Sequence, residues 1–247
     1  MRRLFVVLAL AGCDKVLGLK EHPLPDTPAN GHDEDNDGLG DAEDNCPTIK
    51  GSQEDSDQDG VGDLCDPNPG VANRIAAFYA FDTTPIEWVP RSGSWIFTND
   101  QLVHKGTSGF SKIVARNGLL LTPPYVIEAK FRFDTAPVGS EFSISAALDD
   151  NAAGSFCTII NGALMTEILA YSPGQQGVTR VMPLDFTATF TARMLVEPAR
   201  MTCIMNSDTQ GDTAATSANP DPIRTGPMGL EGRNADTTTD YVIIYAR

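Results

Sequence analysis

YVIEAKFRF, residues 125–133, decides the class of fold. Apolar residues at 127, 129, 131 and 133 alternate with charged residues at 128, 130 and 132. This alternation has the period of a β-strand that buries one face and exposes the other. The run EFSISAAL, residues 141–148, repeats the pattern. We therefore predict two strands whose apolar sides face a shared core.

Other candidate strands lie on both sides of this run, separated by turn signals such as TPP, APVGS, SPGQQG and GRNAD. The candidates are IAAFYAF (75–81), SWIF (94–97), QLVH (101–104), SKIVA (111–115), SFCTII (155–160), ALMTEILA (163–170), GVTRVM (177–182), TATFTARMLVE (187–197), ARMTCIM (199–205) and DYVIIYA (240–246). ALMTEILA can instead form a helical turn. About a dozen short strands without a helical repeat predict one all-β antiparallel sandwich over residues 71–247.

The order of the motifs resembles the concanavalin A-like jelly rolls. The resemblance rests on FD (81–82), SGSWIFTNDQLVHK (92–105), YVIEAKFRF and the closing run GPMGLEGRNADTTTDYVIIYAR. That superfamily includes lectins, laminin-G-like modules, glycan-binding modules and some glucanases. The resemblance implies a jelly-roll β-sandwich, and it implies glycans or surface proteins of a cell envelope as partners.

Two function classes remain open for this domain. Glycoside hydrolysis needs two carboxylates that face one cleft, and glucanases with this fold place them on one strand as E-x-D-x-E or E-x-D-x-x-E. Residues 71–247 contain no such run. We therefore expect a recognition module that is not an enzyme. The alternatives are a glycan hydrolase with dispersed catalytic residues and a purely structural envelope or adhesion protein.

Few single residues stand out in the domain. Trp88 lies in the loop-like stretch IEWVPRSG and is the candidate for stacking on a ligand, although it can also be a packed loop anchor. Trp95 is expected in the core, and His104 is expected at the surface or in a turn. The polar stretch 206–225 is either a binding loop or an extra hairpin at a sheet edge.

A second decisive stretch precedes the sandwich. Residues 33–66 read DEDNDGLGDAEDNCPTIKGSQEDSDQDGVGDLCD and contain one acidic pattern twice. Each copy has aspartate at positions 1, 3, 5, 9 and 12 and glycine at position 6. Carboxylates this close together repel one another unless a cation lies among them, and Ca²⁺ prefers six to eight oxygen ligands. The predicted calcium ligands are Asp33, Asp35, Asp37, Asp41 and Asp44, then Asp55, Asp57, Asp59, Asp63 and Asp66, with the position-7 carbonyls of Leu39 and Val61.

The charge distribution agrees with this interpretation. The chain has 33 acidic and 18 basic residues, a formal net charge of −15. Residues 33–66 hold 13 acidic residues and a single lysine, so most of the excess is local. The alternative is a solvated acidic linker. A nucleic acid is not an expected partner, because binding phosphates needs basic patches.

The flanks of the two copies distinguish them from EF-hands, because prolines and a lack of helical period argue against helices on either side. The runs DxDxDGxGDxxDNCP and DxDxDGVGDLCD resemble thrombospondin type 3 repeats. That resemblance implies that the ten aspartates bind calcium and that Cys46 pairs with Cys65.

The start of the chain indicates export. Met1-Arg2-Arg3 is followed by an apolar run too short to span a bilayer, which is typical of a signal peptide. Leu10-Ala11-Gly12-Cys13 resembles the lipobox of bacterial lipoproteins. It implies a signal peptide over 1–12, an acylated Cys13 as the membrane anchor and a tether over 13–32. We therefore expect a lipid-anchored protein of a bacterial cell envelope, in which residues 33–66 form a calcium-stiffened spacer between the anchor and the sandwich; an ordinary signal peptide is the alternative.

Four cysteines remain besides Cys13, an even number that suits an oxidising compartment. With Cys46 and Cys65 paired, Cys157 and Cys203 are left over. Each lies in an apolar run typical of a strand. They either bridge neighbouring strands or are buried thiols, and we favour the bridge.

Overall fold

The computed structural model describes residues 31–116, 121–146, 154–172, 175–218 and 226–247. The predicted signal peptide, Cys13 and nearly all of the predicted tether lie outside these residues. Within them, no helix has the length and apolar character needed to cross a membrane.

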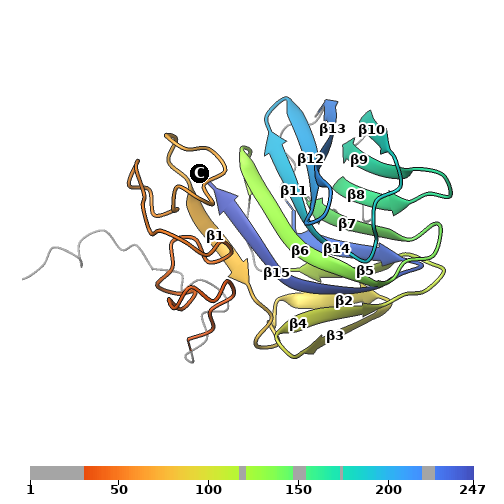
Figure 1. Ribbon diagram of the computed structural model, residues 1–247, viewed down its shortest axis with the longest axis horizontal. Coiled ribbons are helices and arrows are strands. Elements are labelled where there is room, and N and C mark those ends of the chain that lie inside the picture. Colours follow the sequence, from red (N-terminus) through yellow and green to blue (C-terminus); the bar gives the residue numbers. More distant parts are fainter. Residues whose placement is uncertain (1–30, 117–120, 147–153, 173–174, 219–225) are drawn as a thin grey trace, which may run out of the picture.

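The described residues form two antiparallel sheets that pack face to face, which confirms the all-β jelly-roll sandwich (Figure 1). Sheet A has the strand order β13 (Gly211–Ala218), β12 (Arg200–Ser207), β11 (Thr189–Glu197), β6 (Tyr125–Thr135), β15 (Asp236–Ala246), β4 (Gln101–Lys105) and β3 (Ser94–Thr98), and β1 (Arg74–Tyr79) pairs with β15. Sheet B has the order β10 (Gln175–Val181), β9 (Thr166–Ser172), β8 (Ser155–Asn161), β7 (Glu141–Ala146), β14 (Met228–Arg233), β5 (Ser111–Ala115) and β2 (Trp88–Ser92).

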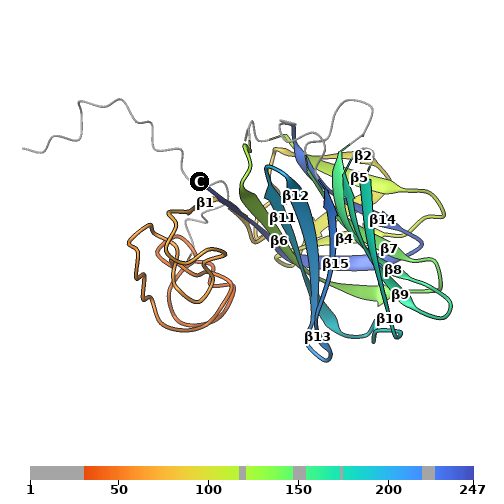
Figure 2. The same ribbon diagram turned by 90° about the horizontal axis from the view of Figure 1, so that it is seen from above.

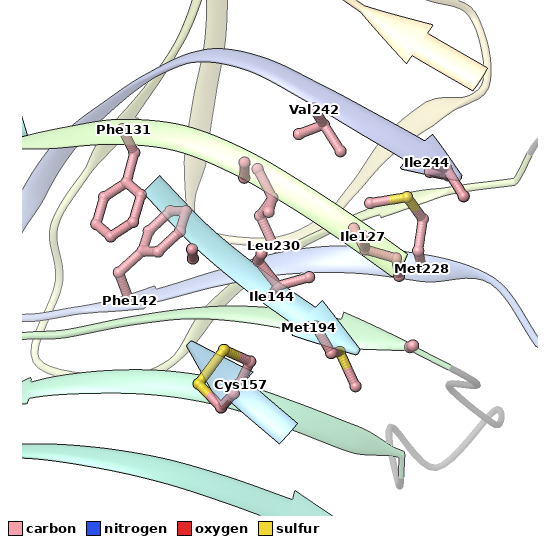
Figure 3. Packing of buried hydrophobic residues seen from close by; sticks show 14 of the residues in the cluster. Ile127, Phe131, Phe142, Ile144, Cys157, Met194, Met228, Leu230, Val242 and Ile244 are labelled. Atoms are coloured by element: carbon pink, nitrogen blue, oxygen red, sulfur yellow. A yellow bond between two sulfur atoms is a disulfide. The ribbon is translucent and has the colours of Figure 1, made fainter. Parts of the chain in front are cut away.

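The main core lies between the sheets and follows from the alternating sequence. Ile127, Phe131 and their alternating neighbours on β6 point inward and are fully buried. The Phe131 ring stacks on Phe142 of β7 in sheet B, with 3.9 Å between the ring centroids. Figure 3 shows these rings and the aliphatic side chains beside them filling the space between the sheets. Strands β6 and β7, which include the predicted runs 125–133 and 141–146, therefore supply the centre of the core, and the last two residues of the predicted run 141–148 lie outside the described residues.

Two local features determine the geometry of the connections between strands. Asn99 and Asp100 have φ of 50° and 56°, as the two central residues of a type I′ hairpin turn require, and they join β3 to β4. Gly93 has φ of 78° where the chain passes from β2 in sheet B to β3 in sheet A. A Cβ at this position would lie 2.1 Å from the Ser111 hydroxyl oxygen, so only glycine fits.

The acidic segment, residues 33–66, lies against the outer face of sheet A (Figure 2). Cys46, Val61 and Cys65 form a second apolar cluster with the outward side chains of β1 and β15. We call the β-sandwich the head. Its buried members of this cluster are Phe78, Ala80, Tyr241, Ile243 and Tyr245. The segment is therefore packed on the head through side chains and is not a separate spacer.

Both predicted disulfides are present. Cys46 pairs with Cys65 inside the acidic segment. Cys157 of β8 pairs with Cys203 of β12, so this bond joins sheet B to sheet A through the core (Figure 3). The sequence suggested a bridge between adjacent strands; the structure shows a bridge between sheets.

Several sequence expectations are corrected or decided. Trp88 is 3% exposed, and its ring packs edge-on against Tyr79 and Phe81, so it offers no surface for a ligand. The run 163–170 is not helical, because β9 begins at Thr166. The polar stretch that begins at 206 supplies β13, which pairs with β12 as the predicted edge hairpin.

His104 is also corrected, because it is fully buried instead of lying at the surface. It points inward from β4, and its ring lies 4.5 Å from the Trp95 ring, centroid to centroid. A Cβ on Gly232 of the opposite sheet would lie 2.6 Å from the His104 ring. The imidazole therefore fills a closed space in the core.

We expect His104 to make the fold sensitive to acid. Burial lowers the pKa of His104 from 6.5 to about 4, although nearby Asp236 opposes the shift. The unfolded chain then binds more protons than the native protein, so stability falls as the pH drops from about 6.5 towards 4. Between pH 6.5 and pH 4 the free energy of unfolding of the native protein should fall by ~2 kcal/mol more than that of His104→Gln. Urea unfolding across this pH range measures the difference. Parallel pH profiles would contradict this expectation.

Candidate functional site

The two halves of the acidic segment form loops with the same hydrogen bonds. In each loop the backbone N–H at position 5 donates to Oδ1 of the position-1 aspartate, at 3.2 Å in the first and 3.3 Å in the second. The position-6 glycine N–H donates to Oδ2 of that aspartate, at 3.0 and 2.9 Å. These glycines, Gly38 and Gly60, have φ of 102° and 93°. The repeated sequence therefore produces a repeated structure.

Each loop gathers the aspartates of positions 1, 3 and 5, with one carboxylate oxygen from each within 4.8 Å of the others. The buried Oδ2 of Asp35 has no hydrogen-bond partner within the described part of the chain. Burial, helped by the charges of neighbouring aspartates and opposed by the Asp37 backbone N–H, raises the pKa of Asp35 to about 6. A donor set made of carboxylate oxygens, one of them unpartnered, fits a hard divalent cation such as Ca²⁺.

The aspartates of position 9 have another role in the structure. Asp41 accepts the backbone N–H of Glu34 at 2.9 Å, and its other oxygen lies 2.7 Å from His32 Nδ1. Asp63 accepts the backbone N–H and the hydroxyl of Ser56, at 2.8 and 2.6 Å. The structure therefore places both side chains where they close their loops by hydrogen bonds, away from the gathered oxygens.

The aspartates of position 12, Asp44 and Asp66, each accept the backbone N–H two residues later at 2.7 Å. Oδ1 of each also accepts a side-chain amide, from Gln53 and Asn73 respectively, at 2.8 Å. At position 7, Val61 buries its side chain in the second apolar cluster, whereas Leu39 is 38% exposed. Ligation by the position-7 carbonyls remains a prediction.

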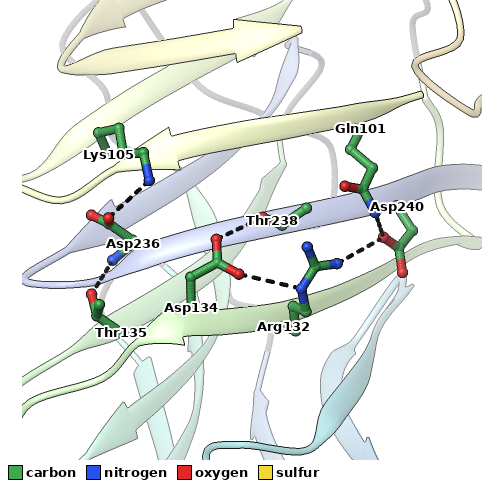
Figure 4. A network of polar contacts seen from close by, with 8 residues as sticks. All are labelled: Gln101, Lys105, Arg132, Asp134, Thr135, Asp236, Thr238 and Asp240. Carbon is green, nitrogen blue, oxygen red and sulfur yellow. Dashed lines mark hydrogen bonds and ion pairs between the residues drawn. The ribbon is translucent and has the colours of Figure 1, made fainter. Parts of the chain in front are cut away.

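The first loop meets a polar part of sheet A. His32, Asp33 and Glu34 line a pocket of about 410 Å³ together with residues of the β3–β4 turn, β6 and β15. On the head side, Asp240 accepts the Gln101 amide at 2.7 Å and lies 3.5 Å from Arg132 Nη1 (Figure 4). Arg132 also contacts Asp134, which accepts the Thr238 hydroxyl. This network holds the pocket wall in place.

The outer face of sheet B carries the second set of candidate residues. Phe156 of β8 and Tyr171 of β9 are cross-strand partners whose ring centroids lie 5.9 Å apart. Tyr171 is 38% exposed. Neighbouring Ser143 and Thr158 share a hydrogen bond of 2.8 Å, and the buried Ser145 hydroxyl has no hydrogen-bond partner among the described residues. The face therefore combines an aromatic pair with hydroxyl groups.

Two ion pairs border this face, and each cation also contacts a ring. Lys112 lies 2.5 Å from Glu231 and 5.6 Å from the Phe156 ring centroid. Arg233 pairs with Glu141 and lies 4.8 Å from the Phe110 ring centroid. Burial raises the pKa values of Glu231 and Glu141, and the neighbouring cations oppose the shift. Both carboxylates lie on the outward side of adjoining strands, β14 and β7.

Sequence reasoning missed these residues of sheet B, although the signal was present. The alternation in SFCTIIN and TEILAYS assigns Phe156 and Tyr171 to the face opposite the core. It does not show which strands are neighbours, and the face is assembled from β5, β14, β7, β8 and β9.

No protein-family model matches the chain, and no curated protein matches it. Solved structures do resemble it. The GH43 protein BlXynB from Bacillus licheniformis is 16% identical with a TM-score of 0.52, over 69% of this chain and 39% of that one. Bacteroides ovatus Xyloglucan PUL GH43B is 15% identical with a TM-score of 0.51, again over 69% and 39%. This chain therefore spans well under half the length of either protein.

A smaller protein matches over nearly its whole length. The CBM2 module of Lactobacillus casei BL23 phage J-1 evolved Dit is 10% identical with a TM-score of 0.51, over 70% of this chain and 96% of that one. At such low identities these similarities establish the fold alone: the head is a jelly-roll β-sandwich.

Proposed function

We propose that the head binds carbohydrate through the outer face of sheet B. The observation that carries this proposal is the Phe156–Tyr171 pair beside a row of hydroxyl groups on one sheet face. Aromatic rings accept the apolar face of a sugar, and the partly exposed Lys112 and Arg233 of the bordering ion pairs supply donors for its hydroxyl groups. The hydroxyl groups of Ser143, Ser145 and Thr158 lie beneath them, in residues at most 8% exposed. The names of the similar structures, which include a carbohydrate-binding module, support a glycan as the ligand class.

The acidic segment in this proposal binds calcium, and the ions hold its loops in the form that packs on sheet A. Asp33, Asp35 and Asp37 hold one ion, and their counterparts in the second loop hold another. Acylation of Cys13 fixes the chain to a bacterial envelope membrane. The head then presents its glycan face at a set position relative to the anchor.

A test of the glycan face compares two single variants with a control. Tyr171→Ala and Phe156→Ala should each weaken binding of a neutral oligosaccharide at least tenfold, because stacking is lost at the centre of the site. Ile86→Ala, at a residue 95% exposed away from the face, should bind like the native protein. Titration calorimetry with ligands found on a glycan array measures this. Equal affinities for all the proteins would rule out the face.

A second candidate function is glycan hydrolysis. Glu231 and Glu141 favour it, because they are two largely buried carboxylates on the same outward face of adjoining strands. Their pairing with Lys112 and Arg233 favours a structural role, so we place binding first. Release of reducing ends from a bound oligosaccharide, lost in Glu231→Gln, would reverse this order.

A further inference from the structure

A pocket of about 360 Å³ lies where the tail of the acidic segment meets sheet A. We call it the junction pocket. Its lining residues are Pro67, Asn68, Asn73, Pro124, Tyr125, Val126, Leu195, Val196, Glu197, Pro198, Tyr245 and Arg247. Residues 67–73, which follow the acidic segment, supply one wall, and the ends of β6, β11 and β15 supply the others. Its volume falls in the range of small-molecule sites.

The junction pocket is distinct from the glycan face. Its sheet residues Val126 and Tyr245 belong to the outer side of sheet A, where they pack with the acidic segment. The glycan face is the outer side of sheet B, on the far side of the core. A ligand in one site therefore cannot contact the other.

The lining combines apolar rings with planar polar groups. Three proline rings and Leu195 supply apolar surface, while an amide, a carboxylate and a guanidinium come from Asn68, Glu197 and Arg247. Such a set offers donors and acceptors around an apolar floor. It suits a sugar ring, which has an apolar C–H face and adjacent hydroxyls that both donate and accept.

The wall of the junction pocket is attached to the second acidic loop. The backbone N–H of Asn68 donates to Asp66 Oδ1 at 2.7 Å, and the Asn73 amide donates to the same oxygen at 2.8 Å. The backbone N–H of Asn73 donates to Asp59 Oδ2 at 2.5 Å, and that of Gly70 donates to Asp57 Oδ2 at 3.0 Å. The carboxylates that would hold calcium therefore also hold residues 66–73 in place.

We propose that the junction pocket is a second saccharide site whose wall is set by calcium in the second loop. This inference rests on the proposed function in its ligand class. It adds that one chain takes two sugars on opposite sides of the sandwich and that one of the two sites requires calcium. Calcium supports the second site because Asp57 and Asp59, which would ligate the ion, also accept the backbone N–H groups of Gly70 and Asn73 in the wall.

The experiment is titration calorimetry of the full-length chain with xylotriose, cellotriose and laminaritriose, in excess calcium and in EDTA. The native protein in calcium should bind two equivalents. Asn68→Ala should weaken one site at least tenfold, and Leu195→Trp, which fills the pocket, should remove it. Among the described residues the Asn68 side chain has no hydrogen-bond partner, and its backbone N–H and carbonyl make the bonds that shape the loop, so Asn68→Ala leaves these bonds intact. Gln58→Asn, an exposed change in the same loop, is the control.

The outcomes separate the two proposals. One equivalent that Tyr171→Ala abolishes and Asn68→Ala leaves unchanged overturns the junction site and leaves the glycan face standing. One equivalent lost in Asn68→Ala and in EDTA, but kept in Tyr171→Ala, supports the junction site and overturns the glycan face. No binding of any trisaccharide overturns both. Loss of both sites in EDTA while circular dichroism stays native contradicts a calcium effect confined to the junction pocket.

Discussion

Replacing Cys157 and Cys203 together by alanine should lower the free energy of unfolding by about 4 kcal/mol in the chain-entropy treatment. The bond closes a loop with a sequence separation of 46, and both sulfurs are fully buried between the sheets. Without it the unfolded chain gains freedom, and the core keeps a small cavity where the sulfurs were. Urea unfolding with a spectroscopic probe of the β-sheet measures the change.

The matched control is the double variant Thr202→Ala with Thr216→Ala. Thr202 directly precedes Cys203 on β12, and Thr216 is the cross-strand partner of Thr202 on β13. Both side chains lie on the outer side of the sheet. Their loss should cost well under 1 kcal/mol, as surface changes usually do. If the cysteine variant were no less stable than this control, the bond between the sheets would not support the fold.

Chelation of calcium should release the acidic segment and destabilise the head with it. When free Ca²⁺ is about 100 times the Kd of a site, that site contributes about 2.7 kcal/mol to the free energy of unfolding, so two such sites contribute about 5 kcal/mol. In EDTA, residues 33–66 should become the first site of proteolysis. The thermal midpoint of the sandwich should fall as well, because Val61 and the Cys46–Cys65 bond pack on Tyr241 and Ile243.

A variant separates calcium from general ionic effects. Asp57→Asn removes one gathered carboxylate of the second loop and should lose about half of the calcium-dependent rise in midpoint. Asp208→Asn, at an exposed aspartate of the head, should keep all of it. Proteolysis and melting that do not differ between calcium and EDTA would exclude a bound ion as the support of the segment.

Alternation predicted most strands, and the exceptions have physical causes. WVPRS was not expected as a strand, because it contains proline, and a strand at GDTAATSA was only one of two alternatives, because it has no alternating apolar side chains. Both are held by pairing with a neighbour, β5 for the first and β12 for the second. The partner of WVPRS lies beyond two intervening strands, so no local pattern reveals it, whereas GDTAATSA forms a hairpin with the strand directly before it.

The candidate sites also have a part that the sequence predicted and a part that it did not. The paired acidic loops are local, and each gathers the aspartates of positions 1, 3 and 5. The gathered sets do not include the predicted ligands of positions 9 and 12, and calcium binding stays a prediction. Glu128 shows what spacing cannot reveal: alternation places it outward, yet it is 3% exposed, paired with Arg193 and bonded to the Tyr241 hydroxyl. It is buried because another part of the chain covers this face.

The pairing of β1 with the end of β15 determines how the molecule would respond to being pulled. Arg74 lies opposite Ala246, and the ladder continues inward to Tyr79 opposite Val242. Tension on the chain before Arg74 would act first on the outermost residue pairs of these two strands. It would separate β1 from β15 one pair at a time, instead of breaking all the pairs together. The two acidic loops that precede β1 are joined by a disulfide and packed on the same strands, so they would bear the force before β1 separates from β15.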